Sequence, residues 1–426
     1  MISAALKYQA RIPVETAFPA LVLLAHHHCS GNIASQRFAG LVKYLPRDKH
    51  SVFIISGPAT AEEHEQHDPE LFVDSSPLLS KASIAARWEV LRHMALVRRN
   101  DHLEMQGNSW IAKAVNAARA RIQSEKNRGK HPVVMATYSP IDALIAARLV
   151  AIAEDVPLIQ DFRDGLAFEN LGRPGALFKS LRKILEAWVV RPAAVITTVS
   201  RPLVRHFEKT YEGKVVSLLY NGFDAEALPE VAMPAQKQRS DKRKQTISIG
   251  HFGRISSSEA ARLETLRMFI SALVDGKFSG RLEFFGTLTS SEIAILNLSG
   301  LDCTFQGHVD RKVALEQMKE MSALIILTGK SESVATGKIY EYLFAGNRIL
   351  IATQAKNEAT RILEEIGDDD VIMDFSDPAS IPPVEVLVEK LLGSFTRNLD
   401  AIKKFDKSVQ AKEFSEILQR VAKAQV

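Results

Sequence analysis

The chain has 426 residues, of which 46% are hydrophobic and 24% are charged, and its formal net charge is +4. These fractions are typical of an ordinary soluble globular protein with enough apolar material for two cores. The sequence has no internal repeat and no low-complexity tract. The small net charge argues neither for nor against nucleic acid, and no nucleic-acid partner is expected.

The cysteine content and the hydropathy pattern indicate in which cellular compartment the protein is expected. Cys29 and Cys303 are too few for a disulfide framework, so a reducing cytoplasm is expected. No apolar run approaches the ~18 residues of a membrane span, and the first residues lack the apolar core of a signal peptide. We therefore expect a cytoplasmic protein, with contact at the inner face of the plasma membrane left open.

Short runs rich in Val, Ile and Leu alternate with segments of helical spacing. This pattern predicts parallel sheets covered by helices on both faces, hence an α/β fold with two doubly wound, Rossmann-like domains. Between the two halves, residues 229–245 are rich in proline and charge and predict a linker. Strands are predicted at 20–25, 51–56, 132–137, 157–161, 194–198 and 215–219, and then at 247–252, 281–285, 303–306, 323–328, 348–352 and 370–373.

The stretch 333–350, SVATGKIYEYLFAGNRIL, carries the most specific chemistry. An apolar strand runs into a loop of small residues, which opens a helix bearing Lys338 and Glu341. The amide groups and the positive dipole end of such a helix make an anion site, to which Lys338 adds a charge suited to phosphate. Glu341, one turn further on, is an acceptor suited to a pair of sugar hydroxyls. The pattern predicts a nucleotide-binding enzyme.

This segment resembles the donor-site motif of the retaining glycosyltransferases with the GT-B fold. Within that group, the chain resembles the glycosyltransferase family 4-like enzymes of the bacterial surface-polysaccharide type. The resemblance implies that Glu341 holds the ribose of a nucleotide-sugar. It implies too that the loop before the helix cradles the diphosphate, with Thr336, Gly337 and Tyr340 in the substrate site. Many members have another glutamate seven positions upstream, where this chain has Val334.

A loop after the first predicted strand reads His26-His27-His28-Cys29-Ser30-Gly31-Asn32. Adjacent loop residues point in different directions and no second cluster supplies further ligands, so no metal site is expected. The resemblance implies instead that Gly31 and Asn32 approach the donor diphosphate, where the family usually has two glycines.

Two segments of the first half carry further candidates. Asp161-Phe162-Arg163-Asp164 follows a strand, and its charges form either a functional site or a structural ion network. The resemblance favours the acceptor side of the active-site cleft, with Asp161 as a catalytic candidate and Arg163 as a binding residue. Whether Asp161 or Asp164 has a chemical role in the reaction stays open. Asn221 opens an Asn-Gly turn that borders the donor cleft in the family.

Two turns of the second half match the family's donor site. Gly253-Arg254 ends a strand, and the resemblance implies that Arg254 contacts the diphosphate. Five positions on, Glu259 stands where many members have a lysine. Gly307-His308-Val309 resembles the turn that meets the nucleobase, so His308 and Val309 are expected to bind substrate.

The predicted helix at 81–99 carries apolar residues on one face and arginines elsewhere. Its composition fits either a core helix with a solvated basic rim or a helix that lies on a membrane surface.

The resemblance implies four regions. They are an acceptor-side domain at 1–228, the linker at 229–245, a nucleotide-sugar donor domain at 246–396, and a helical segment at 397–426 that packs back on the first domain. The expected reaction moves a sugar from UDP- or GDP-sugar to a glycan, lipid-linked or small-molecule acceptor. Arg254 and Lys338 would stabilise the leaving diphosphate without a metal or other cofactor. A nucleotide-sugar epimerase and a non-catalytic nucleotide-sugar-binding subunit remain the alternatives.

Overall fold

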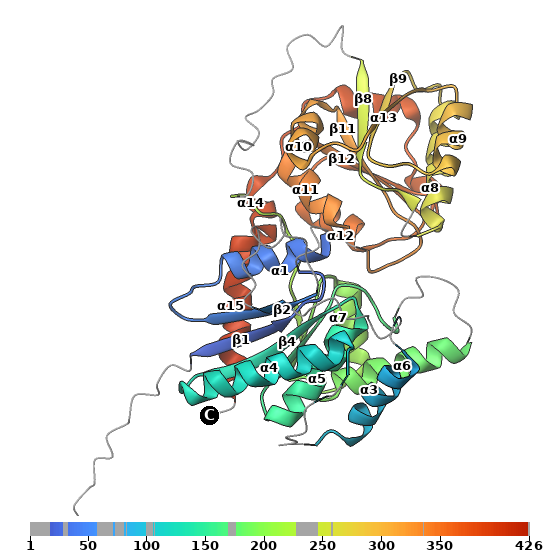
Figure 1. Ribbon diagram of the computed structural model, residues 1–426. Coiled ribbons are helices and arrows are strands. Elements are labelled where there is room, and N and C mark those ends of the chain that lie inside the picture. The colour runs from blue at the N-terminus through green and yellow to red at the C-terminus, as the bar shows by residue number, and fades with distance from the viewer. Residues whose placement is uncertain are drawn as a thin grey trace, which may run out of the picture.

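The computed structural model describes residues 18–28, 33–57, 71–72, 81, 83–98, 105, 107–168, 176–226, 246–256, 259–334 and 336–424. Within these ranges the chain forms two lobes, each built on one sheet (Figure 1). The predicted linker at 229–245 lies outside the described residues, as do Gly31 and Asn32.

The N-terminal lobe contains a seven-stranded parallel sheet in the order β3-β2-β1-β4-β5-β6-β7. All six strands predicted in the first half are confirmed within about two residues at either end. The additional edge strand, β3, has only two residues and is too short to give a hydropathy signal. The strands are β1 (Pro19–Leu24), β2 (Ser51–Ser56), β3 (Leu71–Phe72), β4 (His131–Tyr138), β5 (Leu158–Phe162), β6 (Val195–Thr198) and β7 (Val215–Leu218).

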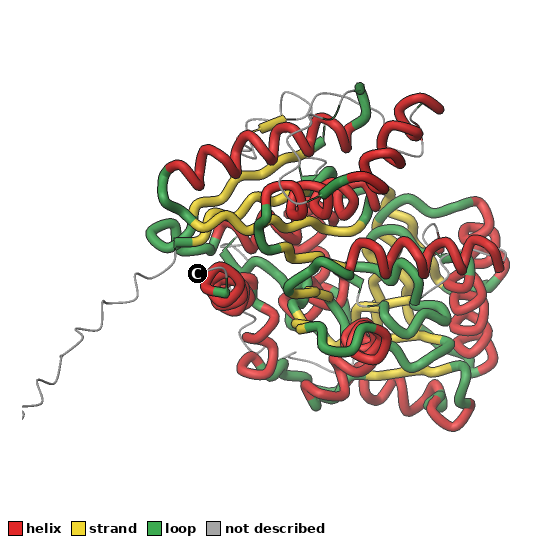
Figure 2. Tube along the Cα trace, turned by 90° about the horizontal axis from the view of Figure 1, so that it is seen from below, coloured by secondary structure: helices red, strands yellow, loops and turns green. Residues whose placement is uncertain are grey.

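Both faces are buried at the centre of this sheet, which is why β1 is an apolar run without polar alternation. Along β1, Val22 and Leu24 face a core with α4 (Trp110–Asn127), α5 (Ile141–Glu154), α6 (Ala176–Val190) and α7 (Arg201–Thr210). Leu21 and Leu23 face the opposite core, with α1 (Ile33–Lys43) and the C-terminal helix α15 (Lys407–Lys423). Figure 2 shows helices on both sides of the strands.

The C-terminal lobe contains a six-stranded parallel sheet in the order β10-β9-β8-β11-β12-β13. Its strands confirm the six predicted in the second half. They are β8 (Ile247–Phe252), β9 (Gly280–Phe285), β10 (Asp302–Gly307), β11 (Ala323–Leu327), β12 (Arg348–Thr353) and β13 (Val371–Asp374). One core lies under α8 (Ala261–Asp275), α9 (Ser290–Leu298) and α13 (Val384–Leu392). The other lies under α10 (Arg311–Glu320), α11 (Gly337–Ala345) and α12 (Glu358–Ile366).

The C-terminal segment returns to the first lobe through α14 (Leu399–Ile402) and then α15. At the crossing, the backbone N–H of Phe223 donates to the carbonyl of Phe405 at 3.0 Å, and the N–H of Lys407 donates to the carbonyl of Phe223 at 2.9 Å. A Cβ atom on Gly222, whose φ is 63°, would lie 2.3 Å from the Phe405 carbonyl oxygen. Glycine is therefore required where the two connections pair.

A second contact joins the lobes away from this crossing. The side chain of Glu358, at the start of α12, accepts the backbone N–H of Arg201 at 3.1 Å. Arg201 is the first residue of α7, so a carboxylate of one lobe lies at the N-terminus of a helix in the other, where the helix dipole favours a negative charge.

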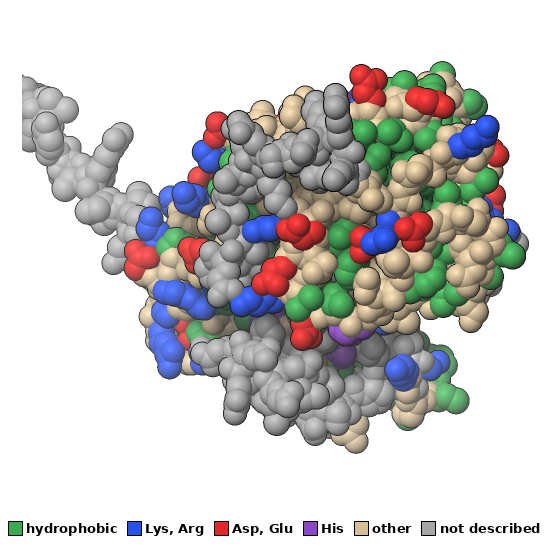
Figure 3. Space-filling view, turned by 90° about the horizontal axis from the view of Figure 1, so that it is seen from above, with side chains coloured by type: hydrophobic (Ala, Val, Ile, Leu, Met, Phe, Trp, Pro, Cys, Tyr) green, Lys and Arg blue, Asp and Glu red, His purple; other side chains and the backbone are tan. Residues whose placement is uncertain are grey.

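Helix α3 (Ile84–Leu96) packs on the core of the first lobe through Val90 and Met94, but the apolar face predicted from the sequence does not face that core. Ile84 and Trp88 are 75% and 67% exposed, and Val90 is the buried residue of this helix. No described helix combines the length and hydropathy that a membrane crossing requires. On the face seen in Figure 3, basic and acidic side chains are interspersed, as the small net charge leads one to expect.

Candidate functional site

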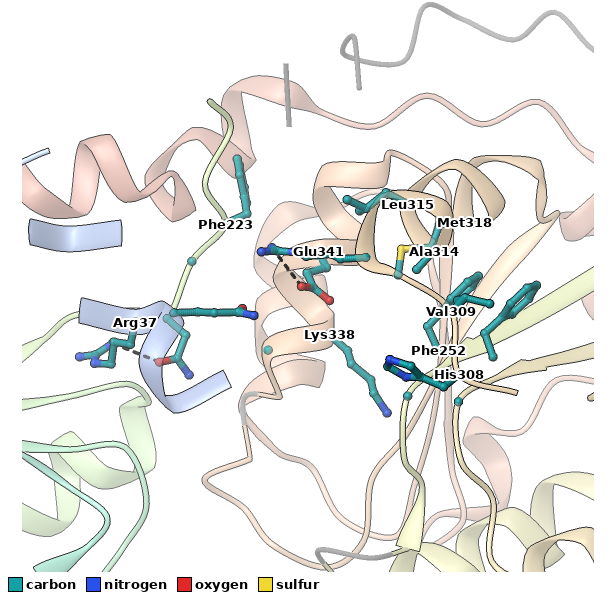
Figure 4. A pocket seen from close by; sticks show the side chains of 18 of the residues that line it. Arg37, Phe223, Phe252, His308, Val309, Ala314, Leu315, Met318, Lys338 and Glu341 are labelled. Carbon is teal, nitrogen blue, oxygen red and sulfur yellow. Dashed lines mark hydrogen bonds and ion pairs between the residues drawn. The ribbon is translucent and has the colours of Figure 1, made fainter. Parts of the chain in front are cut away.

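A cavity of about 220 Å³ lies between the lobes, at the carboxyl ends of β8, β9 and β10 (Figure 4). Open α/β sheets bind ligands at this edge. The first lobe contributes Gln36, Arg37, Asn221, Gly222 and Phe223, and α15 contributes Lys407. The second lobe contributes Phe252, Gly253, Phe285, Gly286, His308, Val309, Arg311, Ala314, Leu315, Met318, Gly337, Lys338 and Glu341.

Part of the cavity wall is glycine backbone. Gly253 and Gly286 follow neighbouring strands and have φ values of 90° and 134°. A Cβ atom on Gly286 would lie 2.9 Å from the Cα of Gly253, so the two strand ends can approach this closely only without side chains. The N–H of Gly286 also donates to the carbonyl of Gly307 at 2.6 Å. Bare backbone of this kind lets a ligand approach the main chain.

Helix α11 presents two of the predicted residues to the cavity. Lys338 lies in its first turn, and Nζ of Lys338 donates to the carbonyl of Arg254 at 2.6 Å. Burial, and then the nearby Arg262 charge, lowers the pKa of Lys338 to about 7. Glu341, one turn later, forms an ion pair with Arg311 at 3.3 Å. The helix thus offers a cation and a carboxylate along one wall, as Figure 4 shows.

The polar lining is mainly cationic. Arg37, Arg311, Lys338 and Lys407 line the cavity, with Glu341 as the carboxylate among the lining residues. Arg37 is paired with Asp161 and Arg311 with Glu341, so Lys338 and Lys407 add positive charge that favours an anionic ligand.

Lys407 enters the cavity wall from the C-terminal crossing. Its Nζ donates to the carbonyl of Gln36 at 2.5 Å, and burial lowers the pKa of Lys407 to about 8. A Cβ on Gly40 would lie 2.2 Å from Cδ of Lys407, so this glycine leaves the space through which the lysine passes along α1. Lys407 therefore lies with its charge shielded from bulk water, where an anionic ligand would interact with it strongly.

The opposite part of the cavity is apolar. Phe252 and Phe285 stack with ring centroids 4.4 Å apart and an interplanar angle of 4°. Leu315, Met318 and Val309 lie beside them in the wall, on or next to α10 (Figure 4). The cavity thus has an apolar end near His308 and a charged end near α11.

Asp161, the catalytic candidate of the first half, does not line this cavity. The side chain is fully buried in the sheet and does not line the cavity. Oδ1 accepts from Arg37 at 2.8 Å and Thr197 at 2.7 Å, while Oδ2 accepts from Arg37 at 3.2 Å and Thr137 at 2.8 Å. Both carboxylate oxygens therefore accept hydrogen bonds from the protein itself. This arrangement is the structural ion network that the sequence analysis gave as one of two alternatives.

Arg163 does not line the cavity, and its guanidinium donates hydrogen bonds to backbone carbonyls of the first lobe. Its Nε donates to the carbonyl of Tyr138 at 2.9 Å and its Nη2 to the carbonyl of Ser139 at 3.0 Å. Asn221, by contrast, lines the cavity and accepts a hydrogen bond from Arg37 at 3.2 Å.

The remaining predicted residues divide between the cavity and its surroundings. Gly253, His308, Val309, Gly337, Lys338 and Glu341 line it. Thr336 is the N-cap residue of α11 but makes no side-chain cap bond, and Tyr340 is fully buried. The side chain of Arg254 is exposed and lies outside the cavity lining, so this residue reaches Lys338 through its carbonyl.

The sequence did not reveal Arg37, Arg311 or Lys407 as cavity residues. Each is a basic residue in a helix and has no local signal that separates it from a solvated charge. Asn221 and Gly222 were the nearest clue, because the Asn-Gly turn pairs with the segment that carries Lys407.

Of the histidine loop, the structure describes His26, His27 and His28. No group of three or more His, Cys, Asp or Glu side chains in the described ranges of the chain is arranged to hold a metal ion. Burial lowers the pKa of His26 to about 4, so this ring is neutral, and it packs against Trp110. A metal-free reaction remains a prediction.

Glu259 has structural partners. Its carboxylate accepts the backbone N–H of Lys330 at 2.9 Å and lies 3.3 Å from Arg262. It thereby fixes the loop that follows β11.

Comparisons with known proteins match both lobes at the level of fold. Anabaena HepE (Alr3699), solved with UDP and glucose, has a TM-score of 0.60 and 14% identity, with 94% of this chain and 99% of that chain covered. Sucrose-phosphate synthase from Thermosynechococcus elongatus has a TM-score of 0.64 and 11% identity, with coverage of 95% and 100%. The apo lipopolysaccharide outer core galactosyltransferase WaaB has a TM-score of 0.63 and 13% identity, with coverage of 93% and 98%. The chain has the GT-B fold.

A family match covers part of the chain. Residues 34–222 match the family described as Glycosyl transferase 4-like domain. The matched range lies in the first lobe and is less than half of the 426 residues. No curated protein sequence matches the chain.

Proposed function

We propose that the protein is a retaining glycosyltransferase that moves a sugar from a UDP- or GDP-sugar to a glycan, lipid-linked or small-molecule acceptor. The observation that carries this proposal is the meeting of Lys338 and Glu341 on one wall of the cleft cavity, beside a floor of glycine backbone. The match to a glycosyl transferase 4-like domain supports it, as does the similarity of fold to HepE, which binds UDP.

The cavity offers a suitable surface to the nucleobase, the ribose and the diphosphate of a nucleotide-sugar. The stacked Phe252 and Phe285, with the side chains of α10, offer an apolar surface for a nucleobase beside the turn at His308. Glu341 would accept hydrogen bonds from two ribose hydroxyls, and these would replace part of its ion pair with Arg311. Lys338 and the N-terminus of α11 would meet the diphosphate.

In the proposed reaction, the bond between the anomeric carbon and the β-phosphate oxygen breaks while the acceptor oxygen bonds to the same face of that carbon. The acceptor proton passes to an oxygen of the leaving diphosphate, so no protein base is needed. Negative charge grows on the β-phosphate as the bond breaks, and Lys338, which lines the cavity, would stabilise that charge. This role replaces the work of a divalent cation.

The carboxylate of Asp161 is bound by Arg37, Thr137 and Thr197, which fits a reaction without an aspartate base in this lobe. Arg37 itself lines the cavity, so Asp161 would orient a residue of the acceptor side.

We propose that the protein binds a membrane surface on which the acceptor lies. Ile84 and Trp88 of α3 and Ile184 of α6 are exposed, and both helices contact α5 in the first lobe. Exposed Arg87 and Lys183 on the same helices would favour anionic lipid headgroups. Co-sedimentation with vesicles containing phosphatidylglycerol should fall in Trp88→Ser and Ile184→Ser. Equal sedimentation by the wild type with neutral vesicles, or none at all, would contradict this placement.

The function is tested by product analysis. Purified protein is incubated with UDP- and GDP-sugars, with and without an extract of lipid-linked and glycan acceptors, and the products are separated by mass spectrometry. Acceptor-dependent release of nucleoside diphosphate with a sugar added to the acceptor supports the proposal. Conversion of the donor to an epimer without an acceptor would make the protein an epimerase. Binding without turnover across the acceptor panel would make it a non-catalytic subunit, a reading to which Val334 and Glu259 lend weight.

A further inference from the structure

His251 lies beneath the cavity, in β8, and both of its ring nitrogens have partners. Its side chain is almost fully buried, with 1% of the residue exposed. Nδ1 lies 3.1 Å from the carbonyl oxygen of Ile325 on the neighbouring strand β11, and Nε2 lies 3.2 Å from Nζ of Lys338.

These partners define the protonation state of the ring. A carbonyl oxygen only accepts, so Nδ1 of His251 must carry a hydrogen and donate it to Ile325. Nε2 then carries the lone pair of the neutral ring and accepts a hydrogen bond from Lys338. The backbone of Arg254 also faces the ring. A charged ring would instead point an N–H at the lysine. Burial, together with the charge of Lys338, holds the pKa of His251 well below its usual value, which agrees with the neutral form.

Lys338 is held from two sides. Its second acceptor is the carbonyl of Arg254, at 2.6 Å, just beyond the bend that Gly253 makes with a φ of 90°. A Cβ on Gly253 would lie 3.2 Å from Cε of Lys338, so the glycine lets the lysine stem pass under the bend. An ammonium group has three N–H donors. Two are taken by His251 and Arg254, which leaves one for a ligand in the cavity.

We propose that His251 is a positioning residue, whose Nε2 lone pair, oriented through Nδ1 by the Ile325 carbonyl, fixes the ammonium group of Lys338 toward the diphosphate of the donor. The identity of the ligand as a nucleoside diphosphate rests on the proposed function. The coupling of His251 to Lys338 does not, because it is a property of the unliganded protein.

The coupling has a measurable consequence for Lys338. Charged groups that face this lysine are Arg262 from α8, Glu292 from α9 and Glu341 from its own helix. His251, from β8, supplies a neutral acceptor that favours the ammonium form. Replacing His251 by a side chain without an acceptor should therefore lower the pKa of Lys338 further, while an amide acceptor should preserve it.

The test compares His251→Gln, which keeps an acceptor and a donor, with His251→Leu, which has neither. In the unliganded protein, the ¹³Cε resonance of Lys338 is assigned with Lys338→Met and titrated. We expect the pKa of Lys338 to fall by about one unit in His251→Leu, the equivalent of about tenfold in protonation equilibrium, and to change much less in His251→Gln. Equal pKa values in all three proteins would overturn the proposal.

Two further measurements keep the proposal testable if His251→Leu does not fold. Nitrogen-15 spectra of the wild-type imidazole, assigned by their loss in His251→Gln, should show the neutral form with hydrogen on Nδ1. The hydrogen on Nε2 instead would overturn the proposal. Affinity for UDP and GDP at pH 8 should drop about tenfold in His251→Leu and less than threefold in His251→Gln. If no nucleotide binds the wild type while the Lys338 titration still depends on His251, the proposed function fails and the coupling stands.

Discussion

Arg37 and Asp161 form a two-armed ion pair within the first lobe, with Nη2 to Oδ1 at 2.8 Å and Nε to Oδ2 at 3.2 Å. The same guanidinium reaches the cavity edge, where Nη1 donates to Asn221 at 3.2 Å and to the carbonyl of Leu219 at 2.9 Å. The buried pair thus connects the centre of the first sheet to the turn that borders the cleft.

This arrangement predicts a stability effect for Asp161→Asn. Removing one charge of a buried pair leaves the other uncompensated and costs about 3–5 kcal/mol. We expect a lower free energy of unfolding by urea denaturation, whereas the exposed Asp164→Asn should change it by no more than about 0.5 kcal/mol. A variant Asp161→Asn that keeps wild-type stability yet loses turnover would restore a chemical role to this residue.

Proton uptake should accompany nucleotide binding. The pKa of Lys338 is lowered to about 7, so above pH 7 the amine is mostly neutral in the free protein. A bound diphosphate favours the ammonium form and raises this pKa. Affinity should therefore weaken as the pH rises above about 7, with protons taken up on binding.

Calorimetry in buffers of different ionisation enthalpy measures this uptake directly. It should be largest near pH 8 and should disappear in Lys338→Met. Uptake that persists in Lys338→Met but is lost in Lys407→Met would assign the protonation to Lys407, whose pKa is lowered to about 8.

Turnover should depend more on Lys338 than on Arg254. Lys338 lines the cavity, whereas the Arg254 side chain is exposed and its carbonyl, which any residue supplies, holds the lysine. Loss of a preorganised group that stabilises developing charge typically costs about 10²–10³ in rate. At saturating donor, Lys338→Met should lose this much, and Arg254→Met should lose less. A rise in the Michaelis constant alone in Lys338→Met would mean uniform binding and not catalysis.

Activity should survive removal of divalent metal ions. The proposed mechanism assigns charge stabilisation to Lys338 and the α11 N-terminus, which a chelator does not affect. We expect turnover in EDTA within about twofold of the untreated rate, a difference of about 0.4 kcal/mol in barrier. Complete loss that Mg²⁺ or Mn²⁺ restores would contradict the metal-free reaction.

Much of the fold could be predicted because parallel strands buried on both faces have an unbroken apolar signature, as in β1 and β11. The wall formed by α11 could also be predicted, because loop, helix start, Lys338 and Glu341 are consecutive. The burial of Asp161 could not be predicted, because a strand-end carboxylate has the same sequence signal whether it faces a cleft or two buried threonines. Lys407 was missed for the opposite reason: it meets the cavity through a chain crossing that spacing along the sequence does not encode.

Nucleotide binding by the wild type and by Glu341→Ala, measured by titration calorimetry with UDP, GDP and ADP, tests the central claim most directly. Glu341 lines the cavity and is proposed to accept from both ribose hydroxyls. Loss of hydrogen bonds to a charged acceptor costs about 1.5–3 kcal/mol. We predict that UDP or GDP binds the wild type and that its dissociation constant rises about 10- to 150-fold in Glu341→Ala. Failure of all three nucleotides to bind the wild type, or equal affinity in the variant, would contradict a nucleotide-sugar site in this cavity.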